Sequence, residues 1–209
     1  MRNVIYLFII ALSLLTSCGL RLKPFDIESQ RQEIEIARYD RLQSRYLATG
    51  DYSALQEMNT EYPIETRTLI EKVLQIGEVV DPNISTKYLH FYQDSTLQSL
   101  ISDTEAEYAD MTDLNKRFNK SFDRLLKWIP SLPIPRIYAQ IGALDQSVII
   151  GNKTIGICLD KYLGINYPLY LKYYTYQQRV SMTRAYIVPD CLAFYLLSVY
   201  PITQADKRS

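Results

Sequence analysis

The chain has 209 residues, and its 23 basic and 23 acidic side chains give a formal net charge of zero. A balanced charge predicts neither nucleic acid nor an acidic polymer as a partner. The length is sufficient for one domain with a core large enough to fold alone.

The first eighteen residues predict a lipoprotein signal peptide. Arg2 supplies a short positive region, and the apolar run 4–15 is too short for a comfortable membrane span. The sequence Leu-Thr-Ser-Cys that ends at Cys18 then matches a bacterial lipobox. We therefore expect residues 1–17 to be removed and Cys18 to carry diacylglycerol and fatty-acyl chains such as palmitate; a signal anchor with an incidental cysteine is the alternative. Each buried CH₂ of such chains contributes about 0.8 kcal/mol, so they would hold the mature chain on a bilayer.

Helices are predicted over most of the region that follows. Residues 33–36 alternate between acidic and apolar side chains and predict a short strand first. Asp40, Asp51 and Asp94 each stand where a helix N-cap is expected, and Gly50 stands at the end of the helix that Asp40 begins.

The clearest helix is predicted over residues 113–128. Its apolar residues recur at three- and four-residue steps, and lysines and arginines occupy the other faces. Three prolines then end the helix and lead into a candidate strand over residues 136–141. We expect this strand to pair with a hairpin over residues 148–160.

The hairpin is the segment around which the rest is expected to be organised. Its turn is predicted at Gly151–Asn152, a pair that tolerates positive φ angles. In the second strand, Ile155, Ile157 and Leu159 alternate with small residues such as Gly156, which predicts close approach by another element. Asp160 ends the strand, where it could either cap a helix or face a cleft.

Tyrosine is the outlier in composition. Nine of the 18 tyrosines fall between Tyr162 and Tyr200. A tyrosine ring with its polar tip suits half-buried walls, interfaces and grooves, so the cluster favours a binding surface. The alternative is structural, with these rings filling a polar-edged core.

The sequence argues against a conventional enzyme. Its one histidine, His90, cannot supply a two-histidine zinc motif, and no HExxH, CxxC, GxSxG or P-loop sequence occurs, so no metal or cofactor is expected. Cys158 and Cys191 lie in apolar segments and could pair in an oxidising periplasm, but we favour buried free thiols. Hydrolysis by paired carboxylates, Asp160 with Asp190, remains the catalytic alternative and requires both in one cleft.

The predicted elements give an α+β fold, mainly helical with a small antiparallel sheet, as a single domain over residues 18–209. Several stretches resemble the gliding motility lipoprotein GldB family of Bacteroidota. They are the lipobox at Cys18, residues 36–40 (IARYD), Asp94 with residues 108–110, residues 128–130 (WIP) with Pro133 and Pro135, residues 156–164 (GICLDKYLG), residues 167–170 (YPLY) and residues 186–190 (YIVPD).

The resemblance implies an anchored envelope protein needed for gliding, alongside components of gliding or type IX secretion. It also implies a distant similarity to zincin-like metallopeptidases, although this sequence keeps none of the metal ligands. Family members are expected to continue through further helices after YIVPD, so the resemblance implies a shortened chain or a truncated reading frame.

These observations lead to one main hypothesis. We expect a lipid-anchored protein of the inner or outer membrane, with its domain in the periplasm, that binds a protein or envelope partner and performs no catalysis. The expected binding residues are Asp160, Tyr162, Tyr167, Tyr170 and Asp190, with lipidation at Cys18.

Overall fold

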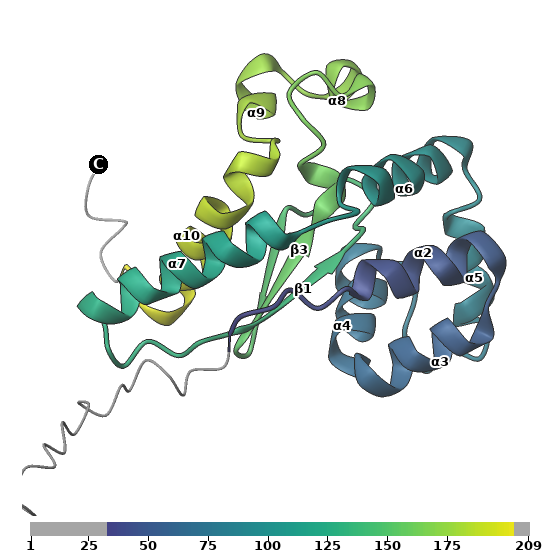
Figure 1. Cartoon of the computed structure of the whole chain (residues 1–209). Coiled ribbons are helices and arrows are strands. Elements are labelled where there is room, and N and C mark those ends of the chain that lie inside the picture. Colours follow the sequence, from purple (N-terminus) through teal and green to yellow (C-terminus); the bar gives the residue numbers. More distant parts are fainter. Residues whose placement is uncertain (1–32, 203–209) are drawn as a thin grey trace, which may run out of the picture. The chain divides into compact units, whose positions relative to one another are not determined.

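The structure, a computed structural model, describes residues 33–202 (Figure 1). The chain divides after Glu33, and the fold lies in the unit that begins at Ile34. The predicted signal peptide, Cys18 and the tail after residue 202 lie outside the described residues. Within residues 33–202, no helix combines the length and the hydrophobicity that crossing a membrane requires.

Most of the described chain is helical. The helices are α2 (Tyr39–Thr49), α3 (Tyr52–Glu61), α4 (Pro63–Thr68), α5 (Ile84–Phe91), α6 (Ser95–Glu107), α7 (Thr112–Trp128), α8 (Pro168–Tyr173), α9 (Tyr176–Val180) and α10 (Ile187–Val199). The strands are β1 (Arg136–Gln140), β2 (Val148–Gly151) and β3 (Thr154–Cys158). A π-helical segment, η2 (Leu69–Val73), continues α4, and short 3₁₀ turns occur at η3 (Leu159–Lys161) and η4 (Arg184–Tyr186). The predicted α+β class is confirmed.

The sheet is mixed and not wholly antiparallel as predicted. Its strand order is β1-β3-β2, with β3 parallel to β1 and antiparallel to β2. The hairpin β2–β3 forms as expected, but β3 lies between the other two strands. β1 and β3 run in the same direction, and the chain between them, which includes β2, provides the crossover connection that a parallel pair needs.

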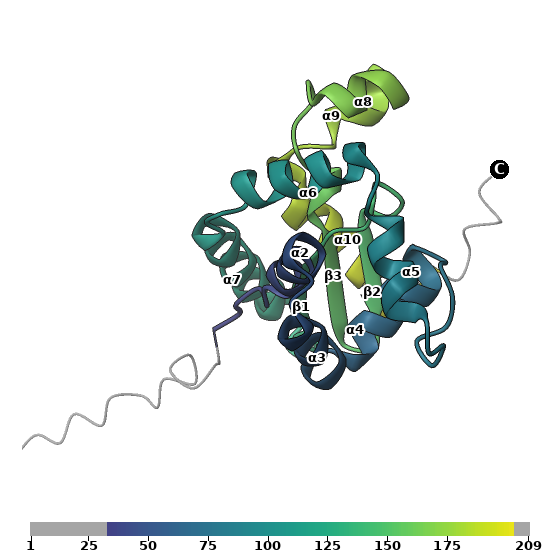
Figure 2. The same ribbon diagram turned by 90° about the vertical axis from the view of Figure 1, so that its right-hand side faces the viewer.

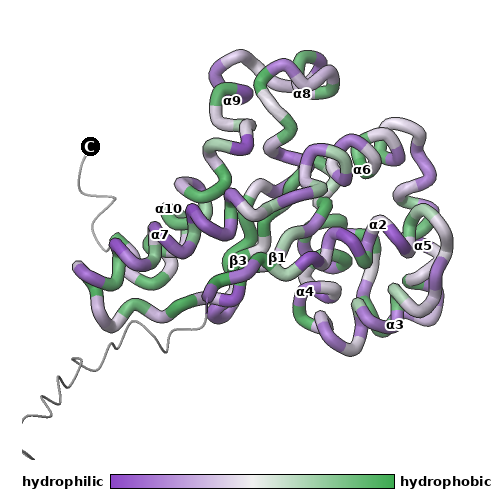
Figure 3. The backbone as a smooth tube through the Cα atoms, in the orientation of Figure 1, coloured by the Kyte–Doolittle hydropathy of each residue, from purple (hydrophilic) through white to green (hydrophobic). Residues whose placement is uncertain are grey.

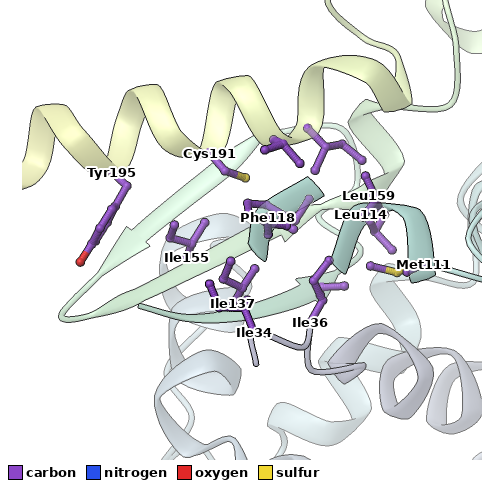
Figure 4. Close-up of a cluster of buried hydrophobic side chains, with 14 of the residues drawn as sticks. Ile34, Ile36, Met111, Leu114, Phe118, Ile137, Ile155, Leu159, Cys191 and Tyr195 are labelled. Carbon is purple, nitrogen blue, oxygen red and sulfur yellow. The ribbon is translucent and has the colours of Figure 1, made fainter. Parts of the chain in front are cut away.

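Helices cover both faces of this sheet. On one face, Ile155 and Ile157 pack in a buried cluster with Phe118 of α7 and Cys191 of α10 (Figure 4). On the other face, Tyr138 of β1 packs in a second cluster with residues of α2, α3, η2 and α5. The middle strand is therefore buried on both sides. Figure 1 and Figure 2 draw it between α10 and α2.

The segment before α2 is extended but forms no strand. Ile34 and Ile36 are buried as their alternation predicts, yet Ala37 makes only an isolated bridge with β1. The side chains of α7 take the place of a neighbouring strand. Asn119 accepts from the backbone N–H of Ile34 at 2.9 Å and donates to its carbonyl oxygen at 2.8 Å, and Asn115 accepts from the N–H of Ile36 at 3.1 Å.

Two of the three predicted N-caps are confirmed. The side chains of Asp51 and Asp94 accept backbone N–H groups at the starts of α3 and α6, and Gly50 ends α2 at φ 68°. The prediction for Asp40 is wrong, because Asp40 lies inside the first turn of α2. Its buried carboxylate accepts two hydrogen bonds from the guanidinium of Arg38, at 2.9 and 2.7 Å.

The long helix predicted at residue 113 is confirmed as α7, with hydrophilic residues recurring between its apolar ones (Figure 3). The hairpin turn lies one residue later than predicted. Gly151 pairs with Thr154 inside the ladder, so Asn152 and Lys153 form the turn, and Lys153 adopts the positive φ of 57°.

The close approach predicted at Gly156 is confirmed. Gly156 lies opposite Tyr138 of β1, and a Cβ atom added to it would stand 2.5 Å from the Tyr138 hydroxyl oxygen. The tyrosine ring thus covers the position where a side chain would project. Glycine is required here by space and not by backbone conformation.

Candidate functional site

The carboxyl ends of β1 and β3 meet at one edge of the sheet because the two strands are parallel. The loop 141–147 leaves β1 there, and η3 follows β3 at the same edge. Asp160, the acidic residue that sequence analysis placed at the strand end, lies in η3. This edge therefore carries the first of the predicted binding residues.

Asp160 neither caps a helix nor faces a cleft, the two alternatives left open by the sequence. Its side chain is fully buried, and its carboxylate accepts from the N–H of Gly142 at 2.7 Å and from that of Leu144 at 2.6 Å. Burial raises the pKa of Asp160, while the two backbone donors and Lys161 act in the opposite direction. The carboxylate fixes the loop after β1.

The fixed loop has an unusual backbone. Ala143 and Leu144 adopt φ angles of 53° and 66°, a left-handed conformation that costs free energy for residues with a Cβ atom. The carbonyl oxygen of Leu144 accepts from the Lys161 ammonium at 3.2 Å and from the Tyr174 hydroxyl at 3.1 Å. Two backbone N–H groups of this loop are thus bonded to the Asp160 carboxylate, and one of its carbonyl oxygens is bonded to Lys161 and Tyr174.

Two of the predicted tyrosines lie in the interior. The buried Tyr170 hydroxyl donates to the Asp160 carbonyl oxygen and accepts from the N–H of Leu163 at 3.1 Å. The buried Tyr162 hydroxyl donates to the carboxylate of Asp190 at 2.9 Å. Burial raises the pKa of both tyrosines and of Asp190. The structure therefore pairs Tyr170 with Asp160 and Tyr162 with Asp190, and these hydrogen bonds brace the chain between β3 and α8.

Tyr167 occupies a different position. It is half-buried, its ring centroid lies 4.9 Å from that of Tyr170, and its hydroxyl donates to Asp103 of α6 at 2.8 Å. Burial and the neighbouring Asp103 carboxylate raise the pKa of Tyr167. Tyr167 joins the braced turn to the surface of α6.

The exposures of the rings separate the binding and structural hypotheses. Tyr162 is 2% exposed and Tyr170 0%, so these two fill the core and offer no surface to a partner. Tyr173 and Tyr176 are 60% and 62% exposed, and neither is among the binding residues expected from the sequence. Helices as short as α8 and α9 show no periodicity that would have distinguished Tyr173 from Tyr170.

Large apolar side chains are exposed along the last three helices. The exposed large apolar residues after residue 170, called the C-terminal apolar surface below, are Leu171, Tyr173, Tyr176, Val180, Tyr186, Phe194, Leu197, Tyr200 and Ile202. α10 is apolar nearly all round, and only one of its faces packs on the sheet. Helices of this composition are ordinarily buried on every side, and exposed apolar patches mark interaction surfaces.

A groove runs along α6 beside the braced turn. Two cavities, of about 330 and 470 Å³, share Asp103 and Tyr167 as lining residues. The other lining residues are Ser95, Thr96, Ser99, Pro168 and Leu169 in the first cavity and Ala106, Glu107 and Leu163 in the second. Together these cavities form what is called the α6 groove below.

The catalytic alternative requires Asp160 and Asp190 to face one cleft, and the α6 groove does not meet this requirement. Asp160 is committed to two backbone N–H groups, and neither Asp160 nor Asp190 lines the α6 groove. Within residues 33–202, no group of three or more histidine, cysteine or acidic side chains could hold a metal ion. Cys158 and Cys191 are buried free thiols, as favoured from the sequence.

The sequence matches the family of the gliding motility protein GldB over residues 22–208. The chain belongs to the GldB family. It is therefore a gliding motility protein by family, of a type associated with the cell envelope. Comparison with curated proteins and with solved structures finds no match, so the zincin-like similarity stays a prediction. The stretches that resemble GldB most specifically, residues 156–164 and 186–190, are linked by the hydrogen bond from Tyr162 to Asp190.

Proposed function

We propose that this GldB-family chain is a lipid-anchored envelope protein that acts by binding a partner and not by catalysis. The observation that carries the proposal is the C-terminal apolar surface. Three helices in succession leave leucine, phenylalanine and tyrosine side chains in contact with solvent. Tyrosine and phenylalanine are enriched in the cores of protein interfaces, whereas an enzyme site is ordinarily concave.

The anchor rests on the lipobox that ends at Cys18. Acylation there would hold the domain at the inner or outer membrane with its body in the periplasm. Metabolic labelling with a palmitate analogue tests this directly: the wild-type protein should be labelled and a Cys18→Ala variant should not. An unlabelled wild-type protein would overturn the anchor.

The buried network supports a structural and not a catalytic use of the predicted residues. Asp160 and Tyr170 hold backbone groups, and Tyr162 holds Asp190. Of the predicted residues, Tyr167 and Asp190 keep some exposed surface. The binding face is therefore assigned to the exposed side chains of α8, α9 and α10, and the partner is a component of the gliding or secretion apparatus. Tyr170 of α8 and Asp190 of α10 take part in the buried hydrogen bonds that hold this region.

The decisive experiment compares two double variants in a deletion strain. Tyr173→Ser with Tyr176→Ser removes two exposed rings from the C-terminal apolar surface. Ile64→Ser with Val80→Ser removes two comparably exposed apolar side chains, 70% and 73% exposed, from α4 and from the turn before α5. Gliding, protein secretion and cross-linking to envelope proteins are scored in each strain.

The tyrosine variant should lose motility and a cross-linked product while its level in the envelope stays normal. The Ile64 and Val80 variant should behave as the wild type. Equal behaviour of both variants would count against partner binding by this surface.

A further inference from the structure

The α6 groove has a regular floor. Ser95, Ser99, Asp103 and Glu107 follow one another at four-residue steps along α6, which places them along one side of the helix. From Ser95 to Glu107 the helix rises about 18 Å at 1.5 Å per residue. An extended peptide of about five residues has this length at 3.3 Å per residue.

The wall of the groove is apolar and comes from the chain after η3 and from the start of α8. Leu163, Pro168 and Leu169 line it, and Tyr167 crosses it to reach Asp103. Hydroxyl groups and carboxylates on one side and alkyl groups on the other suit an occupant that is itself amphipathic. The stems of lysine and arginine side chains are apolar and end in a charge.

The charge of the groove has one sign. Asp103 and Glu107 are the charged residues among those that line the two cavities. Asp103 accepts from Tyr167, a neutral donor, and Glu107 stands 3.8 Å from Arg184, whose guanidinium pairs more closely with Asp113 at 2.6 Å. The groove is therefore acidic along its second half and attracts a cation.

We propose that the α6 groove binds a basic peptide segment of a partner protein. Its lysine or arginine side chains pair with Asp103 and Glu107, their stems lie against Leu163 and Leu169, and its backbone runs along the serine hydroxyls of α6. This inference rests on the proposed function, because it names the chemistry of part of the partner. It concerns a surface separate from Tyr173 and Tyr176.

The test measures binding of labelled probes to the full-length protein by fluorescence anisotropy. The first probe is a hexapeptide of alternating lysine and alanine, the second has glutamate in place of lysine, and the third is a chitin-derived oligosaccharide. The lysine peptide should bind, and its affinity should fall as ionic strength rises. The glutamate peptide and the oligosaccharide should not bind.

A charge-matched pair of variants locates the binding. Asp103→Asn with Glu107→Gln should weaken the lysine peptide roughly tenfold, since two partly exposed charge pairs are lost. Asparagine at position 103 can still accept from Tyr167. Glu35→Gln with Asp145→Asn makes the same change in net charge at exposed positions outside the groove and should leave binding unchanged.

Equal weakening in both variants, preference for the acidic peptide or the oligosaccharide, or no binding of the lysine peptide at about 1 mM would overturn the inference. Failure of the groove inference would not change the result expected for the Tyr173 and Tyr176 double variant. Loss of partner binding in that variant with an intact groove affinity would in turn support the proposed function without depending on the groove. The two proposals therefore fail separately.

Discussion

At the scale of single residues, Asp160 shows what the sequence reveals and what it hides. Its position after an apolar strand marks it as unusual, because a carboxylate there needs a partner. The sequence does not show that its partners are the backbone N–H groups of Gly142 and Leu144, sixteen and more residues earlier. Those donors become available only when β1 and β3 lie side by side.

The pH dependence of stability tests whether burial or the two backbone N–H donors have the larger effect on the pKa of Asp160. Burial raises its pKa in the folded state, so the folded protein holds the proton more tightly than the unfolded chain, whose aspartate titrates near about pH 4. The stability that Asp160 contributes is fully present below that pH and is lost as pH rises through the folded pKa. The unfolding free energy of the wild type relative to Asp160→Asn should therefore fall as pH rises above about 4.

Urea denaturation across the acid range measures this difference. Asp145→Asn, at an exposed carboxylate of the same loop, is the matched control. A relative stability of the wild type that rises with pH would show that the two N–H donors outweigh burial, and would contradict the prediction.

The tyrosines also show that a sequence reveals where residues cluster but not which of them are buried. Their clustering was visible in the sequence, and their burial was not, because neighbouring residues of one short helix divide between core and solvent. Tyr170 is buried and Tyr173 is exposed within the six residues of α8. What decides between them is the position of Asp160 and Leu163, which only the folded chain supplies.

At the scale of elements, long periodic segments were predictable and pairings were not. α7 and the β2–β3 hairpin follow from spacing alone. The parallel pairing of β1 with β3 was missed, although β3 carries a usable signal: Ile155, Gly156, Ile157 and Cys158 are apolar or small on both faces. A strand that is apolar on both faces favours a central position in a sheet, with a neighbour on each side.

The contact between α7 and the segment before α2 yields a prediction. Asn119→Ala should reduce the unfolding free energy by about 1–2 kcal/mol, because it removes both hydrogen bonds to Ile34 and leaves its buried backbone unpaired. Urea denaturation measures the loss, and hydrogen exchange should show faster exchange at the Ile34 amide. Lys120→Ala, on the exposed side of the same helix, should change stability by less than about 0.5 kcal/mol.

Alanine has a higher helix propensity than either lysine or asparagine, so a loss for Lys120→Ala as large as that for Asn119→Ala would show that the bridging side chain is not the specific cause. Unchanged exchange at Ile34 would show that the segment is held by its buried isoleucines alone.

At the scale of the described unit, the sheet separates two buried clusters and also the two thiols. Cys191 packs in the cluster of α7 and α10. Cys158 points to the opposite face with Gly156, where its sulfur lies 3.3 Å from the Gln140 amide nitrogen. A disulfide between them would have to cross from one face of the sheet to the other. The thiols therefore remain free even where the surroundings are oxidising.

Alkylation tests whether the two clusters unfold together. Both thiols are buried, and burial raises the pKa of each, so neither should react with iodoacetamide in the native state. Mass spectrometry during slow unfolding in urea should show Cys158 and Cys191 modified together, with no singly modified intermediate. Early modification of one thiol alone would show that its side of the sheet opens independently.

The strand order has a consequence for biosynthesis. β3 is the last of the three strands to emerge from a ribosome, yet both other strands pair with it and its isoleucines lie in the cluster of α7 and α10. A nascent chain that ends before residue 154 has no middle strand for its sheet, and the apolar face of α7 lacks Ile155 and Ile157 to pack against. Completion of this part of the core is thereby postponed until the hairpin is made, and the apolar surface of the growing chain stays exposed until then.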